Sequence, residues 1–120
     1  MKSRLYNLEM LKVTSDGDKE FLIKVLSTFL TNNKESLSNM QASVKTGNQE
    51  DIGNYAHKML SSYKHLEVNT LIEVLTKLEG LSMGFKLGKQ ETKELVNYLS
   101  LYSASLYQEI EKEIEQIRNE

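Results

Sequence analysis

Hydrophobic residues recur along the chain at the three- and four-residue intervals that are typical of amphipathic helices. A long stripe of this kind lies between about Asp18 and Thr46 and consists of Leu22, Val25, Leu26, Phe29, Leu37, Met40 and Val44. A shorter stripe follows Asn69 and Thr70 and consists of Leu71, Val74, Leu75, Leu78 and Leu81. A third lies between about Gln90 and Arg118 and consists of Leu95, Leu99, Tyr102, Leu106, Ile110 and Ile117. These stripes predict long helices, each buried on one side.

Glycines and capping residues divide the rest of the chain. A short first helix is expected from about Leu5 to Lys12, and Ser82 to Lys89 is expected to form a loop. Asn48 is placed to cap a third helix that ends at His65 or Leu66. Amphipathic helices gain most of their stability by burying their stripes against one another. Four long helices with short connections therefore predict an all-α fold: an antiparallel four-helix bundle with a short additional N-terminal helix.

The length and composition of the chain argue against several kinds of site and several classes of protein. A chain of 120 residues predicts a single domain over residues 1–120. The absence of cysteine excludes disulfides and thiolate metal sites. Acidic and basic residues are interspersed and sum to a net charge of -2, which argues against a broad nucleic-acid surface. Because there is no apolar run of about 20 residues and no leader-like N-terminus, we expect a cytoplasmic protein without membrane contact.

The third predicted helix carries the candidate chemistry. With Ile52 set at zero and a turn of about 100° per residue, the expected core face consists of Ile52, Tyr55, Ala56, Met59, Tyr63 and Leu66. His57 falls at about 140°, outside that face, and Lys64 lies two turns along at about 120°. The side chains nearest His57, at i-4 and i+4, are the small residues Gly53 and Ser61. A glycine in mid-helix costs about 1 kcal/mol relative to alanine, so we interpret it as keeping the imidazole open to a large partner. The alternative is a surface histidine beside a chance lysine.

Several short motifs in this order resemble those of one protein family. Asp18-Lys19-Glu20-Phe21-Leu22 matches an Asp-x-x-Phe-Leu helix start, and Gly47-Asn48 matches a Gly-Asn/Asp cap. The segment Ala56-His57-Lys58-Met59-Leu60-Ser61-Ser62 is similar to Ala-His-x-Leu-Lys-Gly-Ser, and it is followed by Leu66 and by Leu78-Glu79. From Leu8 to Leu81 the chain thus resembles the histidine phosphotransfer (HPt) domains of two-component phosphorelays. Two positions depart from the family pattern, because Leu60 replaces its lysine and Ser61 its glycine.

The resemblance implies a phosphocarrier. His57 would accept a phosphoryl group from the phosphoaspartate of a receiver domain and pass it to the aspartate of another, in a hybrid histidine kinase or a response regulator. A neutral imidazole suits this step, since its reference pKa is about 6.5. Mg²⁺ would be held by the receiver, and the chain would need no cofactor, nucleotide site, small-molecule substrate or kinase activity of its own. Lys64 would replace the lysine missing at Leu60 in steadying the phosphoryl group. The alternative is a helical protein-interaction module with a silent histidine.

A docking surface for the receiver is expected around His57. Gly53, Lys58 and Leu60 are assigned to it, while Ser61 keeps the approach open. Ile23 and Leu30 lie off the main stripe of their helix, and they either extend this apolar surface or complete a wide buried face.

Two further features are interpreted as structural. His65 lies at about 220° near the C-terminal end of its helix, where a protonated imidazole interacts favourably with the helix dipole. Gly84 to Gln90 imitates a phosphate-binding loop, but it is one residue short, lacks the Ser/Thr and does not follow a strand, so we expect an ordinary loop.

Overall fold

The computed structural model describes residues 5–120, and all regular secondary structure in this range is helical. In chain order the elements are α1 (Glu9–Ser15), α2 (Lys19–Thr46), α3 (Gln49–His65), α4 (Asn69–Glu79), the short 3-10 helix η1 (Gly80–Met83) and α5 (Lys89–Arg118). The predicted all-helical class is thereby confirmed. In this range no helix is both long and apolar enough to cross a membrane.

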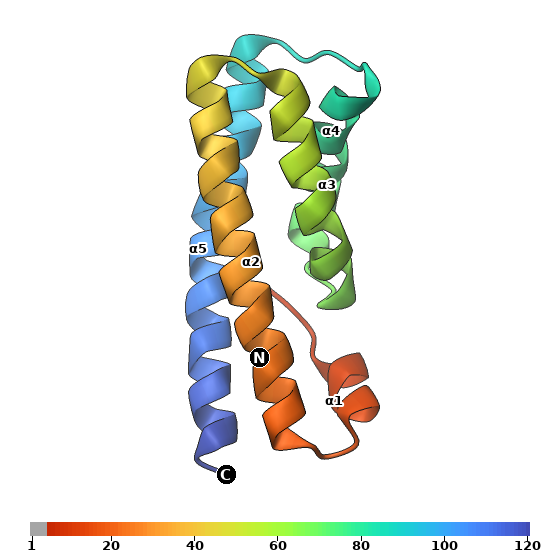
Figure 1. Ribbon diagram of the computed structural model, residues 1–120, viewed down its shortest axis with the longest axis vertical. Coiled ribbons are helices and arrows are strands. Elements are labelled where there is room, and N and C mark those ends of the chain that lie inside the picture. Colours follow the sequence, from red (N-terminus) through yellow and green to blue (C-terminus); the bar gives the residue numbers. More distant parts are fainter. Residues whose placement is uncertain (1–4) are drawn as a thin grey trace.

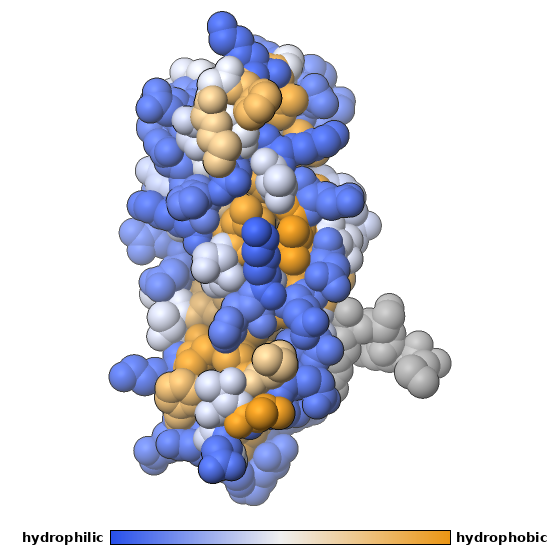
Figure 2. Space-filling view, turned by 90° about the vertical axis from the view of Figure 1, so that its right-hand side faces the viewer, coloured by the Kyte–Doolittle hydropathy of each residue, from blue (hydrophilic) through white to orange (hydrophobic). Residues whose placement is uncertain are grey.

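The helices form an elongated body that measures 47 × 26 × 20 Å. The two longest helices, α2 and α5, lie side by side along its long axis (Figure 1). Helix α3 packs against α2 on one side and against α4 and η1 on the other, while the short α1 contacts α2. The side that α1, α3 and α4 present is largely hydrophilic, with apolar patches that include one over α1 at its lower end (Figure 2).

Local capping explains where α2 and α3 begin. The side chain of Asp18 accepts a hydrogen bond from the backbone N–H of Phe21 at 3.0 Å, and that of Asn48 accepts one from Asp51 at 3.0 Å. Each bond satisfies a backbone donor that has no partner inside the helix. Gly47 closes α2 with φ 73°, a left-handed conformation that costs glycine little. The predicted boundaries of α2 and α3 are confirmed.

The first helix and the predicted loop differ from expectation. Residues 5–8 are not helical, because the backbone N–H of Asn7 donates to Leu66 O at 2.8 Å and ties this segment to the end of α3. Helix α1 therefore begins at Glu9 rather than near Leu5, and it continues to Ser15. The loop predicted from Ser82 is shorter, since η1 extends through Met83.

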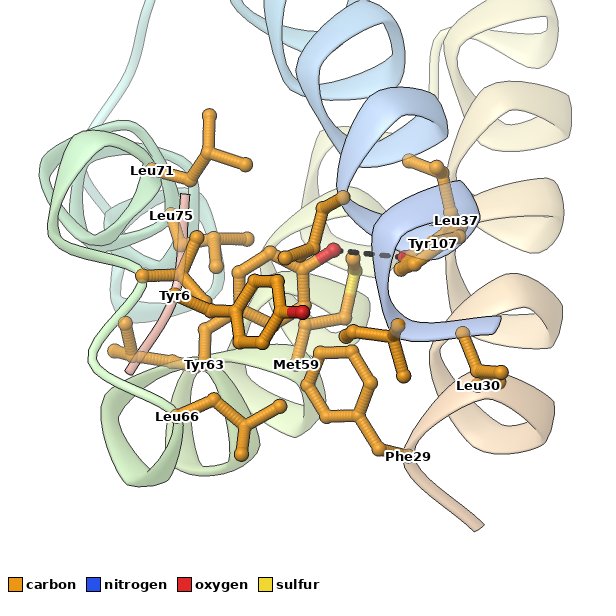
Figure 3. Packing of buried hydrophobic residues seen from close by; sticks show 14 of the residues in the cluster. Tyr6, Phe29, Leu30, Leu37, Met59, Tyr63, Leu66, Leu71, Leu75 and Tyr107 are labelled. Atoms are coloured by element: carbon orange, nitrogen blue, oxygen red, sulfur yellow. Dashed lines mark hydrogen bonds between the residues drawn. The ribbon is translucent and has the colours of Figure 1, made fainter. Parts of the chain in front are cut away.

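One apolar core joins the helices. Tyr63 from α3 lies in it beside Phe29 from α2 and Tyr107 from α5, with the two tyrosine hydroxyls hydrogen-bonded at 2.7 Å (Figure 3). Most of the large, fully buried side chains come from four helices, and Leu66 adds one from the turn after α3: Leu26, Met40, Ile52, Met59, Tyr63, Leu66, Leu71, Leu75, Leu78, Leu99, Leu106 and Ile110. Burying a side chain of this size typically contributes about 1.5–3 kcal/mol, so these contacts hold α3 firmly between its neighbours.

The predicted stripe of α5 is confirmed at Leu99, Leu106, Ile110 and Ile117, which are all buried, but it differs from the buried face at other positions. Tyr102, expected in the core, is exposed, and Val96, Ser103 and Tyr107 are buried instead. Ser103 can enter the core because its hydroxyl pairs with the Tyr63 hydroxyl at 2.7 Å. A stripe defined by apolar residues alone could not include this serine.

Candidate functional site

Helix α3 places His57 on the outside of the protein. The predicted core face is buried at Ile52, Ala56, Met59 and Tyr63, which fixes the rotation of the helix. The side chain of His57 is 72% exposed as a result. A rigid helix, anchored on its opposite face, therefore presents an accessible imidazole.

His57 contacts Glu79, the last residue of α4. Its Nδ1 atom lies 2.5 Å from Oε2 of Glu79, whose side chain is only 15% exposed. A carboxylate can only accept a hydrogen bond, so Nδ1 is the donor. In the neutral ring the second nitrogen, Nε2, then carries the free lone pair. The contact thus selects the tautomer whose outer nitrogen is nucleophilic.

The turn after α4 fixes the position of Glu79. Ser82 in η1 donates from its hydroxyl to the backbone carbonyl of Glu79 at 2.8 Å. The same serine lies against α3 at Gly53, where an added Cβ would come within 2.3 Å of Ser82 N and 2.8 Å of Ser82 Cβ. Only glycine allows η1 to approach α3 this closely. The end of α4, and with it the Glu79 carboxylate, is held beside His57 by this packing.

Gly53 therefore needs a different interpretation from the one its position suggested. It is buried under Ser82, so it neither opens the approach to His57 nor lies on an exposed docking surface. Its absent side chain makes room for η1, a segment of the same chain.

Two other residues assigned to docking are also buried. Leu60 is 6% exposed and Leu30 is 8% exposed, so both belong to the core. For Leu30 the interpretation as part of a wide buried face is correct. Ile23 is partly buried against the same core. A lysine at position 60, as in the family pattern, would here have to carry its charge out of an apolar environment.

The remaining predicted residues are exposed on α3. Lys58, Ser61, Lys64 and His65 all have exposed side chains. Lys58 lies over the ring of Tyr55, with Nζ 5.5 Å from the ring centroid. Within residues 5–120 Lys64 has no carboxylate partner, which leaves its ammonium group available to another anion.

A groove of about 810 Å³ runs between α2 and α3 beside this surface. Phe21 and Val25 from α2 line it together with Tyr55, Lys58 and Ser61 from α3. Lys58 and Ser61 are the neighbours of His57 at i+1 and i+4, so the groove begins next to the imidazole.

No group of three or more histidine, cysteine or acidic side chains within the described range is arranged to hold a metal ion. His57 and Glu79 are thus a pair of residues rather than part of a larger cluster of potential ligands.

No protein-family model, curated protein or solved structure matches this chain. Any function must therefore be inferred from the surroundings of His57 and from the sequence motifs.

Proposed function

We propose that the chain is a histidine phosphotransfer domain, in which His57 carries a phosphoryl group between the aspartates of two receiver domains. The observation that supports it most is the combination of an exposed His57 with a carboxylate on Nδ1. A carrier needs an accessible nitrogen with a free lone pair, and Nε2 meets both requirements. The motif around His57, together with Leu78-Glu79, gives independent support from the sequence.

In the proposed reaction the Nε2 lone pair attacks the phosphorus of an aspartyl phosphate. The N–P bond forms as the bond from phosphorus to the aspartate oxygen breaks, and the aspartate leaves as a carboxylate. The imidazole gains positive charge while Nδ1 keeps its proton. Glu79, 2.5 Å from Nδ1, stabilises that charge as it develops. The return step to a second receiver follows the same path in reverse.

Two exposed residues of α3 would have separate roles in the proposed transfer. Lys64 is the cation that would contact the phosphoryl oxygens, in place of the lysine absent at Leu60. Ser61 is small and exposed, so a partner can approach His57 from that side. Mg²⁺ and the acidic pocket belong to the receiver, and the carrier has no autonomous kinase or nucleotide-binding activity in this proposal.

The proposed function also implies a particular arrangement of the helices. As in other carriers of this type, α2, α3, α4 and α5 would form one antiparallel four-helix bundle, with α1 as an appendage, in a cytoplasmic domain. Such a bundle presents the histidine on a rigid helix rather than a loop, which limits the rearrangement needed for transfer.

A second candidate function requires the same fold but no phosphoryl transfer. Leu60 and Ser61 both depart from the family pattern, and this favours a helical interaction module with a silent histidine as the competing function. The two candidates differ in one property, the ability of His57 to become phosphorylated.

Incubation with phosphorylated receiver domains from the same genome tests the proposal. Label should pass to the chain and be labile in acid but stable in base. His57→Gln should abolish the labelling, and His65→Gln, at the other histidine of α3, serves as the matched control and should keep it. Binding of a receiver without any labelling would favour the silent module.

A further inference from the structure

The groove between α2 and α3 combines an accessible apolar floor with a basic rim. Phe21 is 43% exposed, and Val25 and Tyr55 are partly buried, so all three offer apolar surface to a ligand. An elongated apolar surface between two helices is a common seat for the apolar face of a third helix.

The charged residues of the groove are mostly basic. Lys24, Lys58 and His65 line it, and Glu35 is the one acidic residue among them. This excess is local, because the whole chain has a net charge of -2. Within the described range neither lysine is paired with a carboxylate, and Lys58 lies instead over the Tyr55 ring. Unpaired cations beside apolar surface favour a ligand that brings carboxylates.

The orientation of the His57 ring also favours a partner that lies on the groove side of α3. Glu79 holds Nδ1 from the α4 side of the helix, so Nε2, on the far side of the ring, faces away from α4. Lys58 and Ser61 connect this position to the groove. A partner that reaches Nε2 without displacing Glu79 therefore extends over the groove rather than over α4.

We propose that this groove binds an acidic amphipathic helix of the protein partner. The apolar face of that helix would pack on Phe21, Val25 and Tyr55, and carboxylates along its edges would pair with Lys24 and Lys58. The inference deepens the proposed function, on which it rests for the identity of the partner, but the groove can be tested without phosphoryl transfer.

Two synthetic helical peptides serve as probes. Both carry leucine at positions i, i+3, i+4 and i+7, and the remaining positions are rich in glutamate in one and in lysine in the other. We expect the acidic peptide to bind more tightly in fluorescence anisotropy, with amide shift changes confined to α2 and α3. Lys24→Glu combined with Lys58→Glu should weaken its binding by about tenfold or more. Lys112→Glu, an exposed lysine on α5, is the matched control and should change it by less than about twofold.

Three results would overturn the proposal. The first is equal binding of the basic and acidic peptides, and the second is undiminished binding to the double variant. The third is self-association of the chain, in sedimentation velocity, that the double variant abolishes, because the groove would then hold a second copy. His57→Gln should leave peptide binding unchanged, so a failure of phosphoryl transfer and a failure of the groove are distinguishable.

Discussion

The Nδ1 atom of His57 lies 2.5 Å from Oε2 of Glu79, although the two residues are 22 positions apart in the sequence. The contact joins the middle of α3 to the end of α4. It gives an exposed histidine a fixed tautomer and a nearby negative charge, two properties that an ordinary surface histidine lacks.

Replacing Glu79 with glutamine should therefore slow phosphoryl transfer to His57. A hydrogen bond to a charged group contributes about 1.5–3 kcal/mol, which corresponds to a loss of about ten- to hundredfold in rate. Rapid-quench measurements with a phosphorylated receiver would give this rate. Glu73→Gln, an exposed glutamate on the same helix, should transfer at the original rate. Equal rates for both variants would show that Glu79 has no part in the reaction.

Gly53→Ala should destabilise the fold and loosen the same contact. A Cβ at this position would come within 2.3 Å of Ser82 N, so η1 would have to move away from α3. Overpacking of this kind costs about 1–3 kcal/mol, against a gain of about 1 kcal/mol in helix propensity. Because the atom nearest to the added Cβ belongs to the backbone, the cost should fall at the upper end of this range, and urea denaturation should show a net loss of stability of about 2 kcal/mol. The control is Ser61→Ala, on the exposed side of α3, and an equally stable Gly53→Ala would mean that η1 does not require the glycine.

The buried tyrosine pair should make the protein sensitive to alkaline pH. Burial raises the pKa of Tyr63 far above its usual range, with a further increase from Tyr107, and burial also raises the pKa of Tyr107. Both phenols then stay protonated in the folded state, while the unfolded chain begins to lose these protons near its ordinary pKa of about 10. The stabilising contribution is complete below about pH 10 and is lost as pH rises above it, by about 1.4 kcal/mol per pH unit for each tyrosine.

Denaturation at a series of alkaline pH values checks this dependence. Tyr63→Phe should be less stable at neutral pH by about 1 kcal/mol, because its hydroxyl bonds both Ser103 and Tyr107. It should also lose stability less steeply above about pH 10, since one of the two protonated phenols is gone. A slope identical to that of the original protein would mean that Tyr63 ionises in the folded state.

Lys64→Ala tests whether this residue replaces the missing lysine of the family motif. A contact with a phosphoryl oxygen should lengthen the life of phosphohistidine, so the variant should lose its phosphate faster, by up to about tenfold. If Lys64 only attracts an acidic partner, the substitution will instead lower the association rate, and the difference will fade in high salt. Lys77→Ala, an exposed lysine on α4, is the control. An unchanged phosphohistidine lifetime would contradict the stabilising role.

Elements set by local interactions could be predicted from the sequence. Asp18 and Asn48 cap the helices that follow them, and each cap depends on residues within three positions. The start of α1 was predicted wrongly because the bond from Asn7 to Leu66 joins segments that are distant in the chain. Most of the predicted stripe of α5 is buried, but Ser103 could not be included in it, since the hydroxyl that pairs with this serine belongs to Tyr63 on another helix.

At the candidate site, too, local features could be predicted from the sequence, whereas contacts between distant segments could not. The exposure of His57 followed from helical periodicity alone. The role of Glu79 could not be derived in this way, because no spacing rule relates α3 to α4, and its one signal was the Leu78-Glu79 motif. The cost of a glycine in mid-helix correctly indicates that space is needed beside Gly53, but the prediction assigned that space to a protein partner. The segment that needs the space is η1 of the same chain.

The central claim is that His57 accepts a phosphoryl group on Nε2, and its most direct test is the site of phosphate attachment. After reaction with a phosphorylated receiver, nitrogen and phosphorus NMR of the histidine-labelled chain should show one N–P bond, at Nε2 of His57. The signal should be absent in His57→Gln and should disappear in acid. Phosphate on Nδ1, on His65 or on no histidine at all would contradict the account.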